Sequence, residues 1–264
     1  MNRMLILLSI ILPIFACCRE TAQKPRAIGD RGVSAGSTDT IAFASVGNIP
    51  LPEGYRRVAG GDPAFAQWLL RLPICKDPKV YLYNGQLKPN QTAQFAVLDV
   101  PVGKKDLQQC ADAVMRLRAE YFYSRRQTAA ICFFDNNDKA YACPQNAGRP
   151  AFEQYLEKVY AHCGTLSLER QLKRVPDFNT IQPGDVLIKG GSPGHAVIVL
   201  MVAEDSVTLE KRYLLAQSYM PAQQIHILKN RHQPGLGPWY RVNDANPLIY
   251  TPEWTFSREQ LRRW

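Results

Sequence analysis

Apolar residues recur at helical spacing through the first two thirds of the chain. In 104–123, KKDLQQCADAVMRLRAEYFY, one helical face carries Leu107, Cys110, Val114, Leu117 and Tyr121. This spacing predicts an amphipathic helix. Further helices are predicted at 62–72, opened by Asp62-Pro63, at 151–162, and at 165–174, capped by Thr165 or Ser167.

Strand patterns also lie between these helices, and they dominate the chain after Pro183-Gly184. Apolar and β-branched runs predict strands at 79–87, 92–100, 185–189, 195–203, 208–218 and 223–229, and a hairpin at 129–143 around Asn136-Asn137. A closing helix is predicted where Ser257 and Gln260 fit a capping box. Helices followed by antiparallel strands predict an α+β fold, with helices packed on an antiparallel β-sheet.

The first residues have the pattern of an export signal. Asn2 and Arg3 precede an apolar stretch, 4–16, which is shorter than the roughly 20 residues that span a membrane. The stretch ends IFAC, which resembles a bacterial lipobox with Cys17 as the lipidated residue. An ordinary signal cleaved near Ala16 is the alternative.

The chain is therefore expected to have three parts. Residues 1–16 are a signal peptide, 17–45 a lipidated flexible tether, and 46–264 a single globular α+β domain. Several acyl chains on Cys17 would hold the protein on a bacterial membrane, most plausibly the outer one. This places the protein in the cell envelope.

Composition and net charge limit the classes of molecule that the protein is expected to bind. A chain of 264 residues with 46% hydrophobic and 21% charged residues is not globally disordered. Its net charge of +9 favours binding to anionic surfaces or polymers. Since export argues against nucleic acid, peptidoglycan or another anionic envelope polymer is the expected partner.

Five cysteines follow the lipobox pair: Cys75, Cys110, Cys132, Cys143 and Cys163. Their odd number leaves at least one thiol without an internal partner. Cys132 and Cys143 would face each other only if the hairpin turn centres on Asn137-Asp138. Cys110 lies on the apolar helix face and is favoured as a core residue.

The stretch GGSPGHAVIVL, 190–200, contains two candidate reactive side chains. A serine nucleophile elbow at Ser192 needs a helix after the serine, but AVIVL favours a strand. The glycines and Pro193 therefore predict a tight turn between two strands. His195 is predicted to be the first residue of the second strand.

The succession GDVLI, GHAVIVL and YLLAQS resembles the catalytic strands of the NlpC-type cell-wall peptidases, a papain-like group. The resemblance implies a papain-like arrangement, with His195 as the general base and Gln217 as the residue that orients it. A cysteine thiol loses its proton to such an imidazole. No D-C-S-G motif accompanies the strands, and the resemblance covers only about residues 183–228.

Three residues are candidates for the nucleophile. Cys163 precedes a predicted helix N-terminus, where free N–H groups stabilise a thiolate. Ser167 in the same helix start and Cys110 are the alternatives. The four histidines show none of the usual metal-ligand spacings, so neither a metal nor another cofactor is expected.

A second resemblance covers the chain from about Pro50 to its end. The segments LPEGYRR, YLYNGQLK, DLQQCADAVMRLRAEY, GGSPGHAVIV, LLAQSYMPAQQIHIL and YTPEWTF are similar to bacterial lipoproteins defined by domain of unknown function 4846. The resemblance implies a lipoprotein without an assigned activity. A small residue usually stands in this family where Cys163 is here, whereas Cys110 belongs to the family pattern.

Two functional hypotheses follow. The first is a papain-like hydrolase of amide bonds in cell-wall peptides. The second is a non-catalytic binding or scaffolding lipoprotein on a degenerate papain-like frame, with its aromatic residues lining a groove.

Overall fold

The computed structural model describes residues 43–242 and 246–264. The predicted signal peptide, Cys17 and all but the last residues of the tether lie outside these ranges. Among the described residues, no helix is long and apolar enough to cross a membrane.

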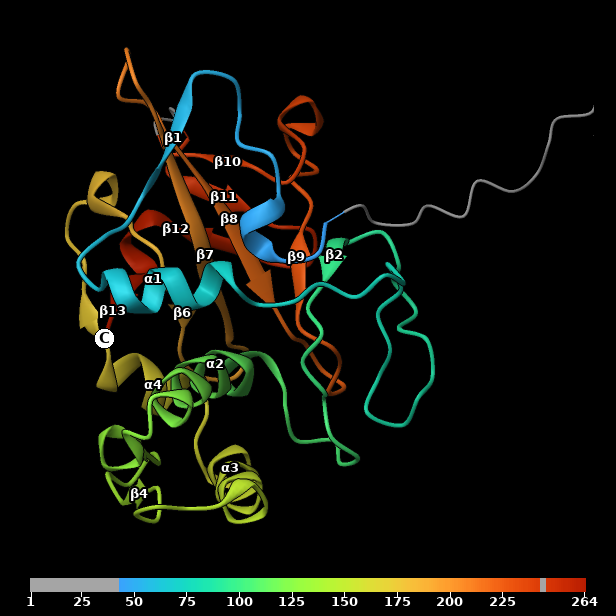
Figure 1. Cartoon of the computed structure of the whole chain (residues 1–264), viewed down its shortest axis with the longest axis vertical. Helices are drawn as coiled ribbons and strands as arrows, with labels where there is room; N and C mark the ends of the chain where they lie inside the picture. The colour runs from blue at the N-terminus through green and yellow to red at the C-terminus, as the bar shows by residue number, and fades with distance from the viewer. Residues whose placement is uncertain (1–42, 243–245) are drawn as a thin grey trace, which may run out of the picture. The chain divides into compact units, whose positions relative to one another are not determined.

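An antiparallel sheet runs through the described domain (Figure 1). Its order is β2 (Gln94–Val97), β9 (His226–Leu228), β8 (Lys211–Gln217), β7 (His195–Asp205), β6 (Val186–Lys189), β13 (Leu261–Arg263) and β5 (Lys173–Arg174). Two further strands extend it: β1 (Tyr55–Val58) pairs with β7, and β10 (Tyr240–Arg241) pairs with β8. The predicted strands at 185–189, 195–203, 208–218 and 223–229 are confirmed in type.

The central strand β7 is buried on both faces, which explains its continuous apolar sequence. Ala196, Ile198 and Leu200 belong to one hydrophobic cluster, and Val197 and Val199 to a second. Successive side chains of a strand point to opposite faces, so β7 divides the core into two layers. The second layer includes residues of the hairpin β11 (Leu248–Tyr250) and β12 (Thr255–Ser257).

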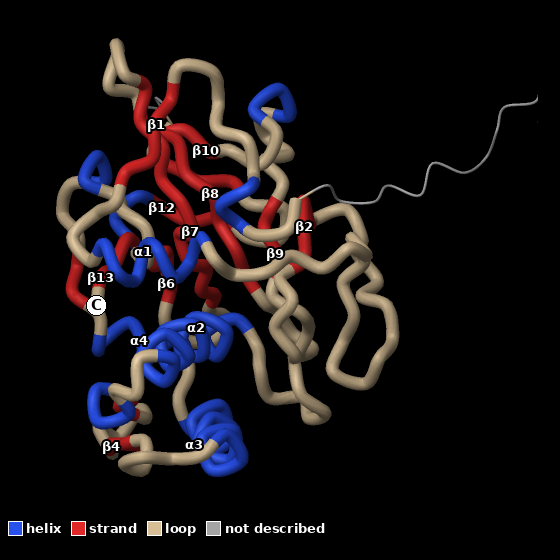
Figure 2. The backbone as a smooth tube through the Cα atoms, in the orientation of Figure 1, coloured by secondary structure: helices blue, strands red, loops and turns tan. Residues whose placement is uncertain are grey.

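The helices pack in the hydrophobic layer that contains Ala196, Ile198 and Leu200 of β7. These are α1 (Pro63–Leu70), α2 (Cys110–Ser124), α3 (Arg149–His162) and α4 (Thr165–Gln171). Figure 2 shows α2, α3 and α4 gathered at one end of the sheet, together with the small hairpin β3 (Cys132–Phe134) and β4 (Ala140–Ala142). Single 3-10 turns lie at Val46–Asn48, Thr128–Ala130, Phe178–Thr180, Pro234–Leu236 and Arg258–Gln260. The α+β prediction is confirmed.

Three local predictions need correction. The long helix begins at Cys110, three residues after Leu107, the first residue of its apolar pattern. The closing segment forms only a 3-10 turn and then strand β13, because pairing with β6 satisfies its backbone. The segment 79–87 forms isolated bridges around its Asn84-Gly85 turn, rather than a continuous strand.

The hairpin register excludes a bridge between Cys132 and Cys143. Cys132 lies opposite Ala142 and Phe134 opposite Ala140, so the turn centres on Asn137. A bridge required a register shifted by one residue. All five cysteines of the described residues are free thiols.

Candidate functional site

His195 is held at the start of β7 by a turn that only glycine fits. A Cβ added to Gly194 would collide with the backbone oxygens of Gly191 and Lys189 and with the Thr165 hydroxyl. The turn joins β6 to β7 as predicted, and a strand rather than a helix follows Ser192. The imidazole of His195 is only 1% exposed.

Gln217 holds the His195 ring from the neighbouring strand. It is the last residue of β8, and its Oε1 lies 2.8 Å from Nε2 of His195. Tyr219, Trp254 and Phe256 enclose the ring, with centroids 4.8 to 5.8 Å from it. The imidazole is therefore fixed in position by one hydrogen bond and three aromatic contacts.

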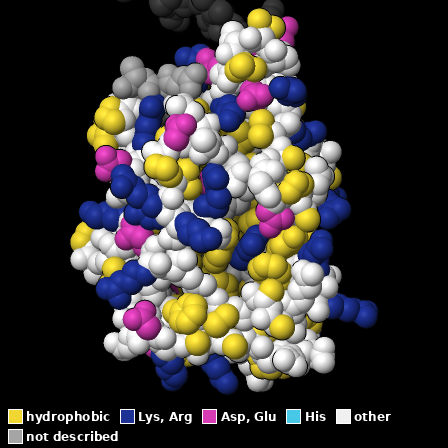
Figure 3. All heavy atoms as spheres, turned by 90° about the vertical axis from the view of Figure 1, so that its left-hand side faces the viewer, with side chains coloured by type: hydrophobic (Ala, Val, Ile, Leu, Met, Phe, Trp, Pro, Cys, Tyr) yellow, Lys and Arg dark blue, Asp and Glu magenta, His cyan; other side chains and the backbone are white. Residues whose placement is uncertain are grey.

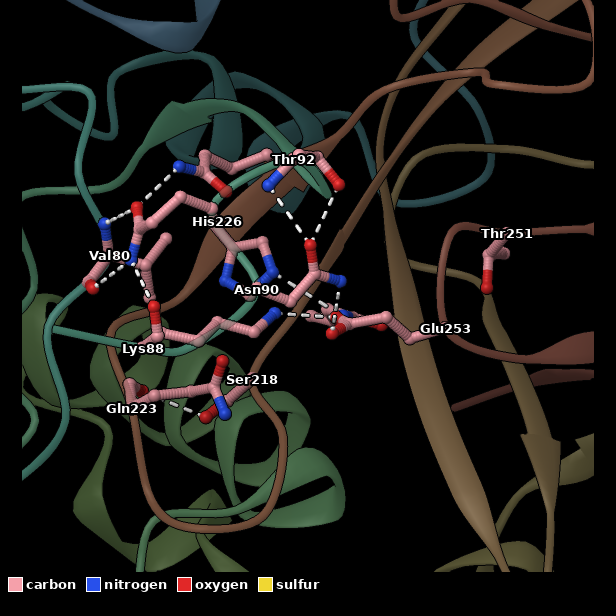
Figure 4. Close-up of polar contacts among 12 residues, drawn as sticks. Val80, Lys88, Asn90, Thr92, Ser218, Gln223, His226, Thr251 and Glu253 are labelled. Atoms are coloured by element: carbon pink, nitrogen blue, oxygen red, sulfur yellow. Dashed lines mark hydrogen bonds and ion pairs between the residues drawn. The ribbon is translucent and has the colours of Figure 1, made fainter.

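Behind Gln217 lies a buried polar network that the sequence analysis missed. Nε2 of Gln217 is 2.7 Å from Oε2 of Glu253 and 3.3 Å from Nε2 of His226. Glu253 in turn binds Lys88 at 2.6 Å and Asn90 at 2.9 Å (Figure 4). Lys88 is 4% exposed and His226 is fully buried, whereas the Glu253 side chain is 13% exposed, so the network is buried except at the Glu253 end.

Burial determines the charge state of both histidines. It lowers the pKa of His195 to about 4, although the hydrogen bond to Gln217 and the charge of Glu253 act in the opposite direction. It also lowers the pKa of His226 to about 3. Both rings are therefore neutral at pH 7.

Cys110 lies with His195 on the wall of one cavity of about 460 Å³. It is the first residue of α2, which packs against β7. Burial raises the pKa of the Cys110 thiol to about 11, and the backbone N–H groups of Ala196, Ala111 and Cys110 itself act to lower it. Ala196 directly follows His195, so the sulfur lies beside the histidine's own strand. Within the described residues, the sulfur has no hydrogen bond to the ring.

The first turn of α2 adds an acid to this cavity. Asp112 accepts a hydrogen bond from the backbone N–H of Gln109 at 2.9 Å, which fixes where the helix begins. Its other oxygen, Oδ1, is buried without a partner in the described structure. Burial raises the pKa of Asp112 to about 8, so this acid is mostly protonated at pH 7.

Cys163 lines the same cavity and lies between two helices, as predicted. It is the C-cap of α3, and Gly164, the next residue, is the N-cap of α4. Burial raises the pKa of the Cys163 thiol to about 12, and the charges of Asp135 and Asp112 raise it further. Burial and these charges therefore act against the predicted stabilisation of a Cys163 thiolate.

Ser167 has a local structural role. Its hydroxyl oxygen accepts a hydrogen bond from the backbone N–H of Gly164 at 3.1 Å and lies 3.3 Å from the Gly164 carbonyl. It is not among the residues that line the cavity. The structure thus brings together His195, Gln217 and Cys110 with Cys163, and leaves Ser167 at the helix cap.

Of the missed residues, only His226 had a usable sequence signal. It lies on the strand after Gln217, and the two residues face each other in the β8–β9 pair. Lys88 and Glu253 are 165 residues apart in sequence, so no local pattern joins them. No group of metal-binding side chains is found among the residues placed by the structure.

Comparison with known proteins assigns the chain to a family but gives it no activity. No curated protein and no solved structure matches it. The family model described as "Domain of unknown function (4846)" matches residues 47–142 and 134–263. Together these matches cover nearly the whole described domain, including Cys110, His195 and Gln217. The chain therefore belongs to the family defined by domain of unknown function 4846.

Proposed function

We propose that this protein is a papain-like cysteine hydrolase in which Cys110 is the nucleophile, His195 the general base and Gln217 the orienting residue. One observation carries the proposal: the hydrogen-bonded His195–Gln217 pair and the thiol at the start of α2 meet at one cavity. A helix-borne thiol, a strand-borne imidazole and an amide on the next strand are the parts of a papain-like site. The NlpC-like strand motifs point to the same arrangement.

The charge states define the first chemical step. With a thiol pKa of about 11 and a histidine pKa of about 4, both groups are neutral at pH 7. Nδ1 of His195 then takes the thiol proton as the sulfur attacks the substrate carbonyl carbon. Backbone N–H groups at the start of α2 stabilise the negative oxygen that forms.

The remaining steps complete hydrolysis. The protonated His195 donates its proton to the leaving amine as the carbon–nitrogen bond breaks, which leaves an acyl group on Cys110. A water molecule then attacks the thioester carbon while His195 accepts its proton, and the carbon–sulfur bond breaks as His195 returns that proton to the sulfur of Cys110. The products are a carboxylic acid and the free thiol.

The proposed substrates are amide bonds in cell-wall peptides, reached from a lipid anchor at Cys17. The cavity of about 460 Å³ is within the size range of small-molecule sites. The net charge of +9 favours an anionic polymer. Figure 3 shows Lys and Arg side chains spread over the displayed face rather than gathered in one patch, which suits attraction to an extended envelope polymer.

Hydrolysis of peptidoglycan fragments tests this proposal. We expect the protein to release new amino termini, detected by mass spectrometry, and Cys110→Ala or His195→Ala to reduce the rate at least about 1,000-fold. Cys163→Ala is the matched control because it removes a thiol from the same cavity, and it should retain most of the activity. Unchanged fragments with the folded wild type would refute hydrolysis of this substrate class.

One observation favours the second candidate, an envelope-binding protein without turnover. The Cys110 pKa is raised rather than lowered, and the thiol makes no hydrogen bond to the ring. Saturable binding of intact peptidoglycan that is equal in wild type and Cys110→Ala, with no products, would support this alternative.

A further inference from the structure

The orientation of the Gln217 amide decides whether His195 can act as a base through Nδ1. An amide presents an accepting oxygen at one end and a donating NH2 group at the other. If the oxygen faces Nε2 of His195, that nitrogen must carry the proton and Nδ1 is left with a free electron pair. If the amide is reversed, the proton moves to Nδ1 and the base is lost.

His226 supplies the first constraint on this amide. Its Nδ1 lies 2.9 Å from the backbone carbonyl oxygen of Gln224, which can only accept. Nδ1 therefore carries the proton, and because the ring is neutral, Nε2 is an acceptor. Nε2 of His226 is the atom that lies 3.3 Å from the Gln217 amide.

Glu253 supplies the second and stronger constraint. Its Oε2 lies 2.7 Å from the same end of the Gln217 amide. Burial opposes ionisation of Glu253, but the hydrogen bonds and charge of Lys88, with the hydrogen bond from Asn90, bring its pKa below the usual value. An ionised carboxylate can only accept, so two acceptors face this end of Gln217.

These contacts leave one arrangement in which every group is satisfied. The NH2 group of Gln217 donates to Glu253 and His226, so Oε1 faces His195 and accepts from its Nε2–H. The free electron pair of His195 is then on Nδ1. Reversing the amide would place its oxygen against a carboxylate oxygen and a ring nitrogen electron pair, both of which would repel it.

We propose that Glu253, ionised by its pairing with Lys88 and assisted by His226, is a positioning residue that fixes the Gln217 amide and thereby the proton on Nε2 of His195. The proposal rests on the proposed role of His195 as base. It explains why a glutamine, which has no charge of its own, serves as the orienting residue. The carboxylate of Glu253, which accepts a hydrogen bond from Gln217, supplies that charge.

Nitrogen NMR of the histidine rings tests this directly, since it distinguishes Nε2–H from Nδ1–H without any substrate. We expect His195 in the full-length, detergent-solubilised protein at pH 7 to be the Nε2–H tautomer. The signal is assigned by its loss in His195→Gln. A His195 ring that is Nδ1–H in the wild type would overturn the proposal without any further variant.

The variant Glu253→Gln removes the charge while keeping the shape. We expect it to convert His195 to a mixture of tautomers and to lower the rate of peptidoglycan hydrolysis about tenfold or more. Glu253→Asp, which keeps a carboxylate, should restore most of the Nε2–H form. Glu157→Gln is the matched control, since it breaks a surface ion pair with Lys105 and should change neither readout.

The His195 tautomer and the rate of hydrolysis, measured on the same proteins, separate the role of Glu253 from the hydrolase proposal. An unchanged His195 tautomer in folded Glu253→Gln would refute the role of Glu253 and leave the hydrolase proposal standing. An inactive wild type with the expected tautomers would refute the hydrolase and leave the positioning of the ring intact.

Discussion

Gly194 is the residue that most tightly constrains where His195 lies. Its missing side chain lets the 190–194 turn close against α4, because a Cβ there would meet two backbone oxygens and the Thr165 hydroxyl. Backbone atoms cannot move aside as the end of a flexible side chain can. The glycine before the histidine, visible in the sequence as part of a turn, is thus a requirement of close packing.

Replacing Gly194 by alanine should therefore destabilise the fold and displace His195. We expect the free energy of unfolding to fall by about 1–3 kcal/mol, as for other overpacked sites. Gly235→Ala is the control, because no atom lies near its added Cβ and its φ is outside the left-handed region. Urea unfolding of both variants measures the difference, and equal stabilities would contradict the steric argument.

At the scale of elements, the start of α2 determines the environment of Cys110. The apolar spacing continues back to Leu107, so the sequence pattern alone placed Cys110 in a helix interior. The side chain of Asp112 accepts the N–H of Gln109 and the helix begins at Cys110 instead. The spacing of Gln109 and Asp112, an N-cap residue and an acid three positions later, is the local sequence signal for this helix start. The apolar periodicity alone does not show it.

The first turn of α2 also controls the acidity of the thiol. The charge of Asp112 raises the pKa of Cys110, after burial as the larger cause. Because the pKa of Asp112 is about 8, this effect is present above pH 8. We expect Asp112→Asn to speed alkylation of Cys110 by iodoacetamide a few-fold at pH 9, since a lower pKa gives more thiolate.

Glu120→Gln on the same helix is the control for this experiment, since Glu120 does not contribute to the pKa of Cys110. Labelling is located by peptide mass spectrometry. Equal rates for Asp112→Asn and the wild type at pH 9 would show that the carboxylate does not act on the thiol.

At the scale of the whole molecule, the sheet joins segments that are remote in sequence into one polar core. Lys88 and Asn90 come from the turn region before β2, Gln217 from β8, and Glu253 from the loop between β11 and β12. The two histidines of this core, His195 and His226, are buried and remain neutral. Stability should therefore depend on pH.

The two histidine pKa values determine whether the free energy of unfolding rises or falls with pH. The unfolded rings bind protons near pH 6.5, whereas His195 and His226 do so near pH 4 and 3. As the pH falls from about 6.5 toward 4, the unfolded state binds more protons, and each ring lowers the free energy of unfolding by up to about 1.4 kcal/mol per pH unit. The pKa of Asp112 is raised to about 8, so below pH 8 the folded state binds the extra proton and Asp112 increases the free energy of unfolding as the pH falls.

A comparison of two proteins isolates this effect. His226→Gln should lose less stability than the wild type between pH 6.5 and 4.5, measured by urea unfolding at several pH values. Its stability at pH 7 will be lower, because a buried hydrogen-bonded ring is replaced. Parallel stability curves for the two proteins across this range would contradict a neutral buried His226.

The sequence by itself determined the four helices, the strands β6 to β9, the α+β class, the turn before His195 and the strand that carries Gln217. Those features follow from spacing and turn chemistry, which act over a few residues. Only the tertiary structure decided that Cys110 and His195 share a cavity, and that Glu253, Lys88 and His226 lie behind Gln217. The hydrogen bonds behind Gln217 join residues 9 to 165 positions apart, and a local pattern does not record which distant partner satisfies a buried polar group.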